Sequence, residues 1–306
     1  MEASWYIPDL LPTMGASEAM QRIMRHRWIS WKSLYDAVKE NQSAEQIHDF
    51  RVASRRLRQA MACLVFYSSS TAKLKHHNHA IKTLADHAGE VRDSDIMLHK
   101  IQILKSKHSK IQSANWDYIE NQIETKRLRS LQQFQNTIQK TDLDIDISWV
   151  FSESETKNDP IGVTAVDLAV QWIKERSEAL WIAESDCGDP LSSRALHVFR
   201  IETKRLRYSV EMWSGILGGN ISQTIKILKK LQDYLGLIHD CDTIIKTLRK
   251  SAQIYKTENE IHNVTIIKTI HYVVRERISI THRFYSYWNS NMRRVLQKQI
   301  KHFVME

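Results

Sequence analysis

The sequence is poor in the residues that interrupt or cross-link a chain. Its 306 residues include only eight glycines and four prolines. Because sheets with many turns need more of these residues, their scarcity favours an all-α fold built from long helices. The three cysteines, Cys63, Cys187 and Cys241, are widely spaced and form no Cys-x-x-Cys pair. An odd number of separated thiols excludes a disulfide scaffold and favours a reducing compartment.

Long hydrophobic runs are also missing. No apolar stretch reaches the roughly 18 residues that a membrane-spanning helix needs, and the N-terminus lacks the basic and apolar regions of a signal peptide. We therefore expect a cytoplasmic protein that is not attached to a membrane. Lys and Arg outnumber Asp and Glu by 44 to 35, and the net charge is +9. Such a charge attracts polyanions, which include nucleic acids, anionic membranes and phosphate polymers.

Apolar residues recur with the helical period of 3.6 residues along most of the chain. Ser43 and Gln46 resemble a capping box at the start of one helix. Residues 1–16 form an N-terminal extension, and an acidic linker at about 141–160 separates a first helical half (about 17–140) from a second (about 161–302). The predicted helices lie near 17–38, 44–67, 72–88, 94–106, 112–139, 162–184, 191–217, 221–236, 241–254 and 259–301.

Two sequence blocks occur twice in the same order, which indicates an internal duplication. The segment HDFRVASRRLR at 48–58 aligns with HVFRIETKRLR at 197–207. The segment KTLADHAGEVRDSD at 82–95 aligns with KKLQDYLGLIHDCD at 229–242. The duplication predicts two helical halves that are related by pseudo-twofold symmetry.

The first repeated block places basic residues on one face of a helix. Each residue advances by 100°, so positions 48, 51, 55 and 58 fall within a narrow arc, and Phe50 and Leu57 lie on the opposite side. A solvated surface is the ordinary explanation for such a face, but two copies in register favour a site for phosphate, which matches the planar guanidinium fork. The basic stripe of the first half is His48, Arg51, Arg55 and Arg58, and that of the second half is His197, Arg200, Lys204 and Arg207; Arg56 and Arg205 point to the side.

The second repeated block contains Gly89 and Asp93 in the first half, and Gly236 and Asp240 in the second. Glycine is typical of helix C-termini, and aspartate is typical of the N-cap of the next helix. The block therefore predicts a break in the helical structure at each of these places. The two aspartates could also hold stripe arginines in position through ion pairs.

These repeated motifs resemble those of the CHAD family, the conserved histidine α-helical domain. The resemblance covers about residues 17–302 as a single domain, and rests on four motif segments in the right order. It implies two four-helix bundles related by pseudo-twofold symmetry, and binding of inorganic polyphosphate in a central basic cavity. The ligands that it implies are His48, Arg51, Arg55, Arg56, Arg58, His197, Arg200, Lys204, Arg205 and Arg207, with Lys82, Lys229, Arg92 and His239 as further candidates.

Two other functions are compatible with parts of the sequence. Nine tryptophans, ten tyrosines and a basic C-terminal helix would suit a nucleic-acid-binding protein, but no helix-turn-helix, zinc-finger or RNA-recognition signature is present. A phosphohydrolase or phosphotransferase could use His48 or His197, but the chain has neither a phosphate-binding glycine loop nor a dense carboxylate cluster for Mg²⁺.

We therefore expect a stand-alone, non-enzymatic polyphosphate-binding protein with no cofactor, no catalytic residue and no metal ligand. Its expected partner is inorganic polyphosphate, and we do not expect it to bind nucleic acid or a membrane. The sequence indicates no particular protein partner. Within the cytoplasm, polyphosphate granules are the place where such a protein would gather.

Overall fold

The computed structural model describes residues 6–68, 72–107, 113–141, 162–187, 192–255 and 260–305. Within these ranges the chain forms nine helices and no strand, so the prediction of an all-α fold is confirmed. The predicted linker at 141–160 lies outside the described residues, except for Thr141. The helices are α1 (Ala16–Glu40), α2 (Ala44–Tyr67), α3 (Ala72–Lys107), α4 (Ser113–Lys140), α5 (Ala165–Ser185), α6 (Ser193–Met212), α7 (Ile221–Tyr255), α8 (Glu260–Tyr287) and α9 (Ser290–Met305).

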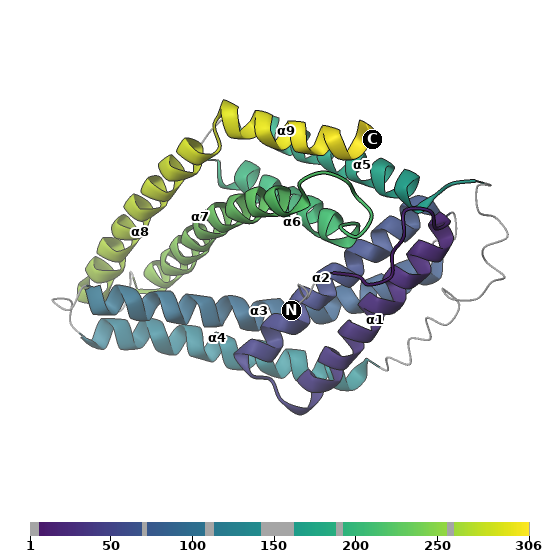
Figure 1. Cartoon of the computed structure of the whole chain (residues 1–306). Coiled ribbons are helices and arrows are strands. Elements are labelled where there is room, and N and C mark those ends of the chain that lie inside the picture. The colour runs from purple at the N-terminus through teal and green to yellow at the C-terminus, as the bar shows by residue number, and fades with distance from the viewer. Residues whose placement is uncertain are drawn as a thin grey trace.

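Helices that follow one another along the chain pack together in the same order in both halves. The first half runs from α1 to α4, in the lower part of Figure 1, and the second half runs from α5 to α8 before α9 folds back onto α5 and α7. The halves meet where α1 contacts α5 and α2 contacts α6. This junction brings together α2 and α6, which carry the two basic stripes. A twofold axis between the halves stays a prediction.

Aromatic side chains occupy matching places in the cores of the two halves. The ring centroids of Phe50 on α2 and Phe134 on α4 are 6.0 Å apart, and those of Phe199 on α6 and Phe284 on α8 are 6.4 Å apart. All four rings are fully buried. Burial of this face determines the orientation of α2 and α6, because the basic stripe lies on the opposite side of each helix.

Two predicted helix breaks do not occur. α3 continues through Gly89 and α7 continues through Gly236, so neither glycine ends a helix and neither Asp93 nor Asp240 is an N-cap. A glycine inside a helix costs only about 1 kcal/mol relative to alanine. Each of these helices packs against both of its chain neighbours, and this packing offsets that cost.

The last predicted helix, at 259–301, is instead divided into α8 and α9. Asn289 precedes α9, and its side-chain oxygen accepts hydrogen bonds from the backbone N–H groups of Asn291 (3.0 Å) and Met292 (3.1 Å). Asn289 is therefore an N-cap within a segment whose apolar pattern is otherwise helical throughout. By contrast, the predicted capping box of Ser43 and Gln46 at the start of α2 is confirmed.

The described part of the N-terminal extension packs onto both halves. Ile7, Leu10 and Met14 are buried in the core. The backbone N–H of Ala165 donates to the Met14 carbonyl at 2.8 Å, and Ala16 N–H donates to the Val163 carbonyl at 3.0 Å. These bonds tie the start of α1 to the start of α5, and so help to set the relative position of the halves.

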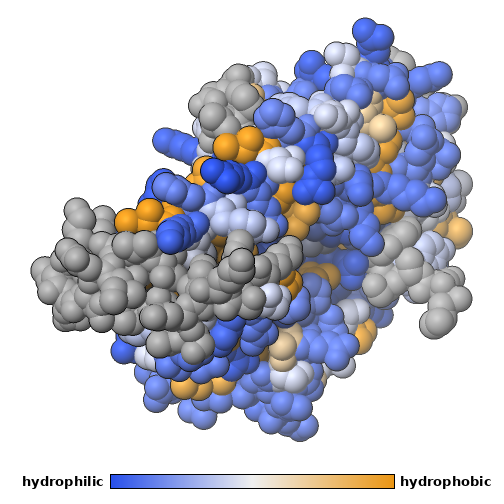
Figure 2. All heavy atoms as spheres, turned by 90° about the vertical axis from the view of Figure 1, so that its left-hand side faces the viewer, coloured by the Kyte–Doolittle hydropathy of each residue, from blue (hydrophilic) through white to orange (hydrophobic). Residues whose placement is uncertain are grey.

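One face of the molecule is largely polar where its residues are described (Figure 2). The face seen in Figure 2 is mostly hydrophilic, and hydrophobic residues appear on it in separate patches. None of the helices in the described ranges combines the length and the hydrophobicity that are needed to cross a membrane.

Candidate anion-binding site

A cavity of about 130 Å³ lies between the two halves, where α2, α3, α6 and α7 approach one another. Its described lining contains five Arg or Lys side chains but only two carboxylates. The cavity therefore has an excess of positive charge that is contributed by both halves. The charged and imidazole side chains of the lining are His48, Arg51, Arg55, Arg92, Asp93, Lys100, Arg200, His239 and Asp240, and the other lining residues are Val52, Ile96, Met97, Thr243 and Ile244.

Arg51 is held against α3 by the second repeated block. Its Nη1 donates hydrogen bonds to the Gly89 carbonyl at 2.9 Å and to Asp93 Oδ1 at 3.2 Å. A Cβ at Gly89 would lie 3.4 Å from Arg51 Nη2, which is van der Waals contact, so a side chain larger than that of alanine would meet this guanidinium. Asp93 thus positions Arg51 through an ion pair. The small size of Gly89 lets the Arg51 guanidinium of α2 lie close to the backbone of α3.

Arg200, which is equivalent to Arg51, has different surroundings. In the described part of the chain its buried Nε has no hydrogen-bond partner, and the same holds for the buried Nε of Arg92. Asp240 is bound instead by Lys100 of the other half, with 3.3 Å between Nζ and Oδ2. Buried donors are nearly always satisfied in folded proteins. An anion in the cavity is a suitable acceptor for the Nε groups of Arg92 and Arg200.

Two histidines of the second half are in contact beside the cavity. The Nδ1 atoms of His197 and His239 are 3.3 Å apart, and their ring centroids are 4.8 Å apart. A hydrogen bond between two imidazole nitrogens requires that one ring nitrogen lacks a proton. Burial, followed by the charge of Arg200, lowers the pKa of both rings, that of His239 to about 4. Both rings are therefore neutral near pH 7 when no anion is present.

Burial and mutual repulsion lower the pKa values of the basic stripe. Burial, together with repulsion from Arg55, Arg200, Arg51 and Arg207, lowers the pKa of Lys204 to about 6. Burial and then Arg55 lower the pKa of Arg51 and that of Arg200. The pKa of His48 is lowered by burial and by Arg92. Nearby negative charge is thus insufficient to compensate for these cations, and a bound anion would raise each of these pKa values.

Some of the predicted ligands lie behind the wall of the cavity or outside it. His197 contacts the cavity through His239, and Lys204 lies among the stripe arginines. Neither residue is part of the cavity wall itself. Lys82 binds Asp86 on the surface of α3 at 3.0 Å, and Lys229 is exposed on α7.

Other predicted ligands make contacts within the protein. Arg56 and Arg207 both bind Glu211, which is 1% exposed, with N–O distances of 3.5 and 2.5 Å. Arg58 Nε donates to Asn78 Oδ1 at 3.1 Å, and Arg205 binds Glu202 at 2.6 Å. Arg56 therefore joins the two halves and Arg58 joins α2 to α3, whereas the ion pairs of Arg205 and Arg207 lie within α6. The residues that reach the cavity are His48, Arg51 and Arg55 of the first stripe and Arg200 of the second.

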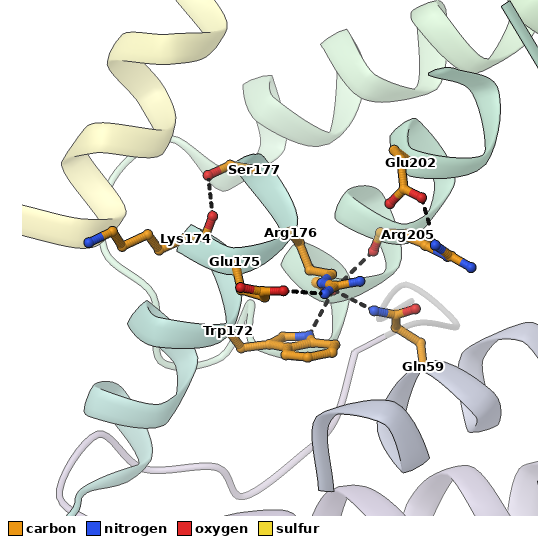
Figure 3. A network of polar contacts seen from close by, with 9 residues as sticks. Gln59, Trp172, Lys174, Glu175, Arg176, Ser177, Glu202 and Arg205 are labelled. Atoms are coloured by element: carbon orange, nitrogen blue, oxygen red, sulfur yellow. Dashed lines mark hydrogen bonds and ion pairs between the residues drawn. The ribbon is translucent and has the colours of Figure 1, made fainter. Parts of the chain in front are cut away.

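A second set of polar contacts joins the halves beside the stripes. Figure 3 shows Gln59 of α2, Trp172 of α5 and Arg205 of α6 gathered at one place. Ser209 Oγ accepts hydrogen bonds from Gln59 Nε2 (3.0 Å) and Trp172 Nε1 (2.9 Å), and donates one to the Arg205 carbonyl (2.9 Å). Three helices are thereby connected through one hydroxyl group, which fixes the relative position of α2 and α6.

Several residues of the cavity wall did not belong to the predicted site. They are Lys100, Thr243 and the apolar group Val52, Ile96, Met97 and Ile244. Asp93, Ile96, Met97 and Lys100 share one face of α3 because the helix is continuous at this point. The predicted helix at 94–106 already placed Ile96, Met97 and Lys100 on one face, but the break predicted before it separated them from Arg92 and Asp93.

The CHAD domain model matches residues 22–249, which is well over half of the chain. The fold is similar to the CHAD domain from the plant Ricinus communis, with a TM-score of 0.68 and 20% identity over 91% of this chain and 93% of that one. It is also similar to PptA from Streptomyces chartreusis, with a TM-score of 0.71 and 12% identity over 91% of this chain and 99% of that one. No curated protein sequence matches. The chain belongs to the CHAD domain family.

Proposed function

We propose that this chain binds linear inorganic polyphosphate in the cavity between α2, α3, α6 and α7. The observation that carries the proposal is that Arg51 and Arg200, from equivalent helices of the two halves, line the same cavity. Membership of the CHAD family, which is commonly linked to polyphosphate binding, supports it.

The chemistry of the cavity favours a ligand with several negative charges. Guanidinium groups bind phosphate through pairs of parallel hydrogen bonds. Arg92 and Arg200 have buried Nε donors without acceptors in the described structure. A polyphosphate chain has a charged group at every unit, so one chain can neutralise cations of both halves.

A nucleic-acid strand is the first alternative ligand. Proteins that bind single strands without sequence preference combine a basic groove with aromatic rings on which successive bases stack. None of the described residues that line this cavity is Phe, Tyr or Trp. The cavity therefore suits a slender phosphate chain better than a strand of stacked bases.

Catalysis on phosphate is the second alternative, and we propose that the chain is a binding protein and not an enzyme. Phosphoryl transfer commonly relies on Mg²⁺ held by carboxylates. No group of three or more His, Cys, Asp or Glu side chains in the described ranges could hold a metal ion. Asp93 and Asp240 are occupied by ion pairs with Arg51 and Lys100.

Calorimetric titration with long-chain polyphosphate tests the proposal. Arg51→Ala and Arg200→Ala are each expected to weaken binding by about 1–3 kcal/mol, because each removes charge-assisted hydrogen bonds to phosphate. Arg294→Ala is the matched control, since Arg294 is exposed on α9, away from the cavity. Helicity by circular dichroism should be unchanged in all three variants. Unaltered affinity in both cavity variants would contradict the proposal.

Two further measurements separate the alternatives. Displacement of bound polyphosphate by single-stranded DNA or RNA, at an equal concentration of phosphate groups, would favour the nucleic-acid function. Release of phosphate during prolonged incubation with Mg²⁺ and polyphosphate, if it is lost in the His48→Ala/His197→Ala variant, would identify an enzyme. We expect neither displacement nor release.

A further inference from the structure

Part of the wall of the same cavity is apolar. Val52 of α2 and Ile96 of α3 are half-buried there, and Met97 of α3 and Ile244 of α7 are buried. Inorganic polyphosphate is charged at every unit, and burial of charge beside alkyl groups without polar partners is unfavourable. The apolar wall is therefore not explained by a purely inorganic ligand.

Charged and apolar side chains occupy successive turns of the same helices. On α3, Ile96 and Met97 follow Arg92 and Asp93 by one turn. On α7, Ile244 follows Asp240 by one turn. The cavity thus has a basic part and an adjoining apolar part, which matches a ligand with phosphates at one end and an uncharged organic group at the other.

We propose that the cavity accepts a nucleoside polyphosphate, with its phosphates at Arg51, Arg55 and Arg200 and its base against Ile96, Met97 and Ile244. This inference rests on the proposed phosphate-binding function of the same site. Proteins hold single bases between apolar side chains and recognise their polar edges through a few hydrogen-bonding groups. Lys100 and Asp240, 3.3 Å apart in their ion pair, lie next to the apolar wall and supply a donor and an acceptor.

Adenosine triphosphate and inorganic tripolyphosphate provide a direct comparison. Both contain three linked phosphates, but tripolyphosphate has one more ionisable group and so the larger negative charge. Charge alone therefore predicts tighter binding of tripolyphosphate. The inference predicts the reverse, with adenosine triphosphate bound at least about tenfold more tightly, which corresponds to about 1.4 kcal/mol. Calorimetry in Mg²⁺-free buffer measures both affinities, and equal or weaker binding of adenosine triphosphate would overturn the inference.

A matched pair of variants on α3 tests whether the base of the nucleotide lies against Ile96. Ile96→Ser is expected to weaken the binding of adenosine triphosphate more than the binding of tripolyphosphate, and so to abolish the preference for the nucleotide. Ile103→Ser is the control, because Ile103 is 40% exposed on the same helix and is not part of the cavity wall. A nucleotide preference that survives Ile96→Ser, or an equal loss of both ligands, would contradict the assigned position of the base.

The two proposals fail in distinguishable ways. Binding of tripolyphosphate without any preference for adenosine triphosphate would overturn this inference and leave the proposed function standing. If the unmodified protein bound neither compound and no long-chain polyphosphate, the proposed function would fall, and this inference with it.

Discussion

Equivalent residues on the two sides of the cavity differ in how readily they lose a proton and become neutral. Arg55 of the first half corresponds to Lys204 of the second, and Arg92 corresponds to His239. Arginine stays protonated at all ordinary pH values, whereas lysine and histidine lose their protons when burial and neighbouring cations disfavour the charge. At these two positions the first half therefore contributes a fixed charge, and the second half contributes a charge that depends on pH and on the ligand.

Lys204→Arg is expected to reduce the dependence of polyphosphate affinity on pH. The pKa of Lys204 is lowered to about 6 in the free protein, so this amine is mostly neutral at pH 7–9. A bound anion raises that pKa, so binding takes up a proton, and affinity falls as the pH rises above about 6, by at most about tenfold per pH unit for one proton. Arginine is already charged over this range. Calorimetry at pH 7, 8 and 9 should therefore give a steeper decline for the unmodified protein, and identical declines would count against this role of Lys204.

Gly89 and Gly236 occupy matching places in the repeat but have different neighbours. A Cβ at Gly89 would lie 3.4 Å from Arg51 Nη2, whereas no described atom lies within 4 Å of a Cβ at Gly236. Gly89→Leu should therefore displace the Arg51 guanidinium and weaken polyphosphate binding. Gly236→Leu is the matched control, because it makes the same chemical change in open space. Titration of both variants checks this difference, and an equal loss of affinity would show that the approach of Arg51 to Gly89 is unimportant.

At the scale of helices, the sequence predicted α2 and α6 well because their signals are local. The capping box of Ser43 and Gln46 marks the start of α2, and Phe50 and Phe199 identify the buried faces. The continuity of α3 and α7 was not predictable in the same way. Glycine weakens a helix by an amount that packing against neighbouring helices can exceed, and this packing depends on contacts between residues far apart in the sequence. The division at Asn289 was missed because its cap lies inside a continuous apolar pattern.

The duplication also extends to an ion pair that connects neighbouring helices. Asp95 of α3 binds Arg127 of α4 at 2.5 Å, and Asp242 of α7 binds Arg277 of α8 at 2.6 Å. Asp95 and Asp242 are equivalent in the second repeated block. The structure thus identifies Arg127 and Arg277 as further matching residues, in a region where the sequence alignment had found no repeat.

Arg277→Met is expected to lower the free energy of unfolding by about 2–3 kcal/mol, because it leaves the partly buried Asp242 without its partner. The Arg277 side chain is 8% exposed and that of Asp242 is 20% exposed. Lys32→Met is the control, since the Lys32–Asp36 pair lies on the surface of α1 and should change stability by less than about 1 kcal/mol. Chemical denaturation measures both variants. Similar effects of the two substitutions would contradict a structural role for the repeated ion pair.

At the scale of the whole molecule, the relative position of the halves determines whether there is a site. Helical periodicity gives the face on which each stripe lies, but it does not say whether two faces from different halves meet. That depends on the contacts at the junction, such as Arg56 of α2 with Glu211 of α6, and Gln59 of α2 with Ser209 of α6. These contacts join residues of different helices, and no pattern within one helix predicts them. The basic stripes were therefore predictable, whereas the shape and apolar wall of the cavity were not.

The central claim is that both halves contribute to one shared site, and the stoichiometry of binding tests it most directly. Calorimetric titration with a short polyphosphate of defined length should give one ligand per chain. Arg51→Ala and Arg200→Ala, from opposite halves, should each weaken that single binding event without changing its stoichiometry. Two ligands per chain, with each variant removing one and leaving the other unaffected, would contradict the claim.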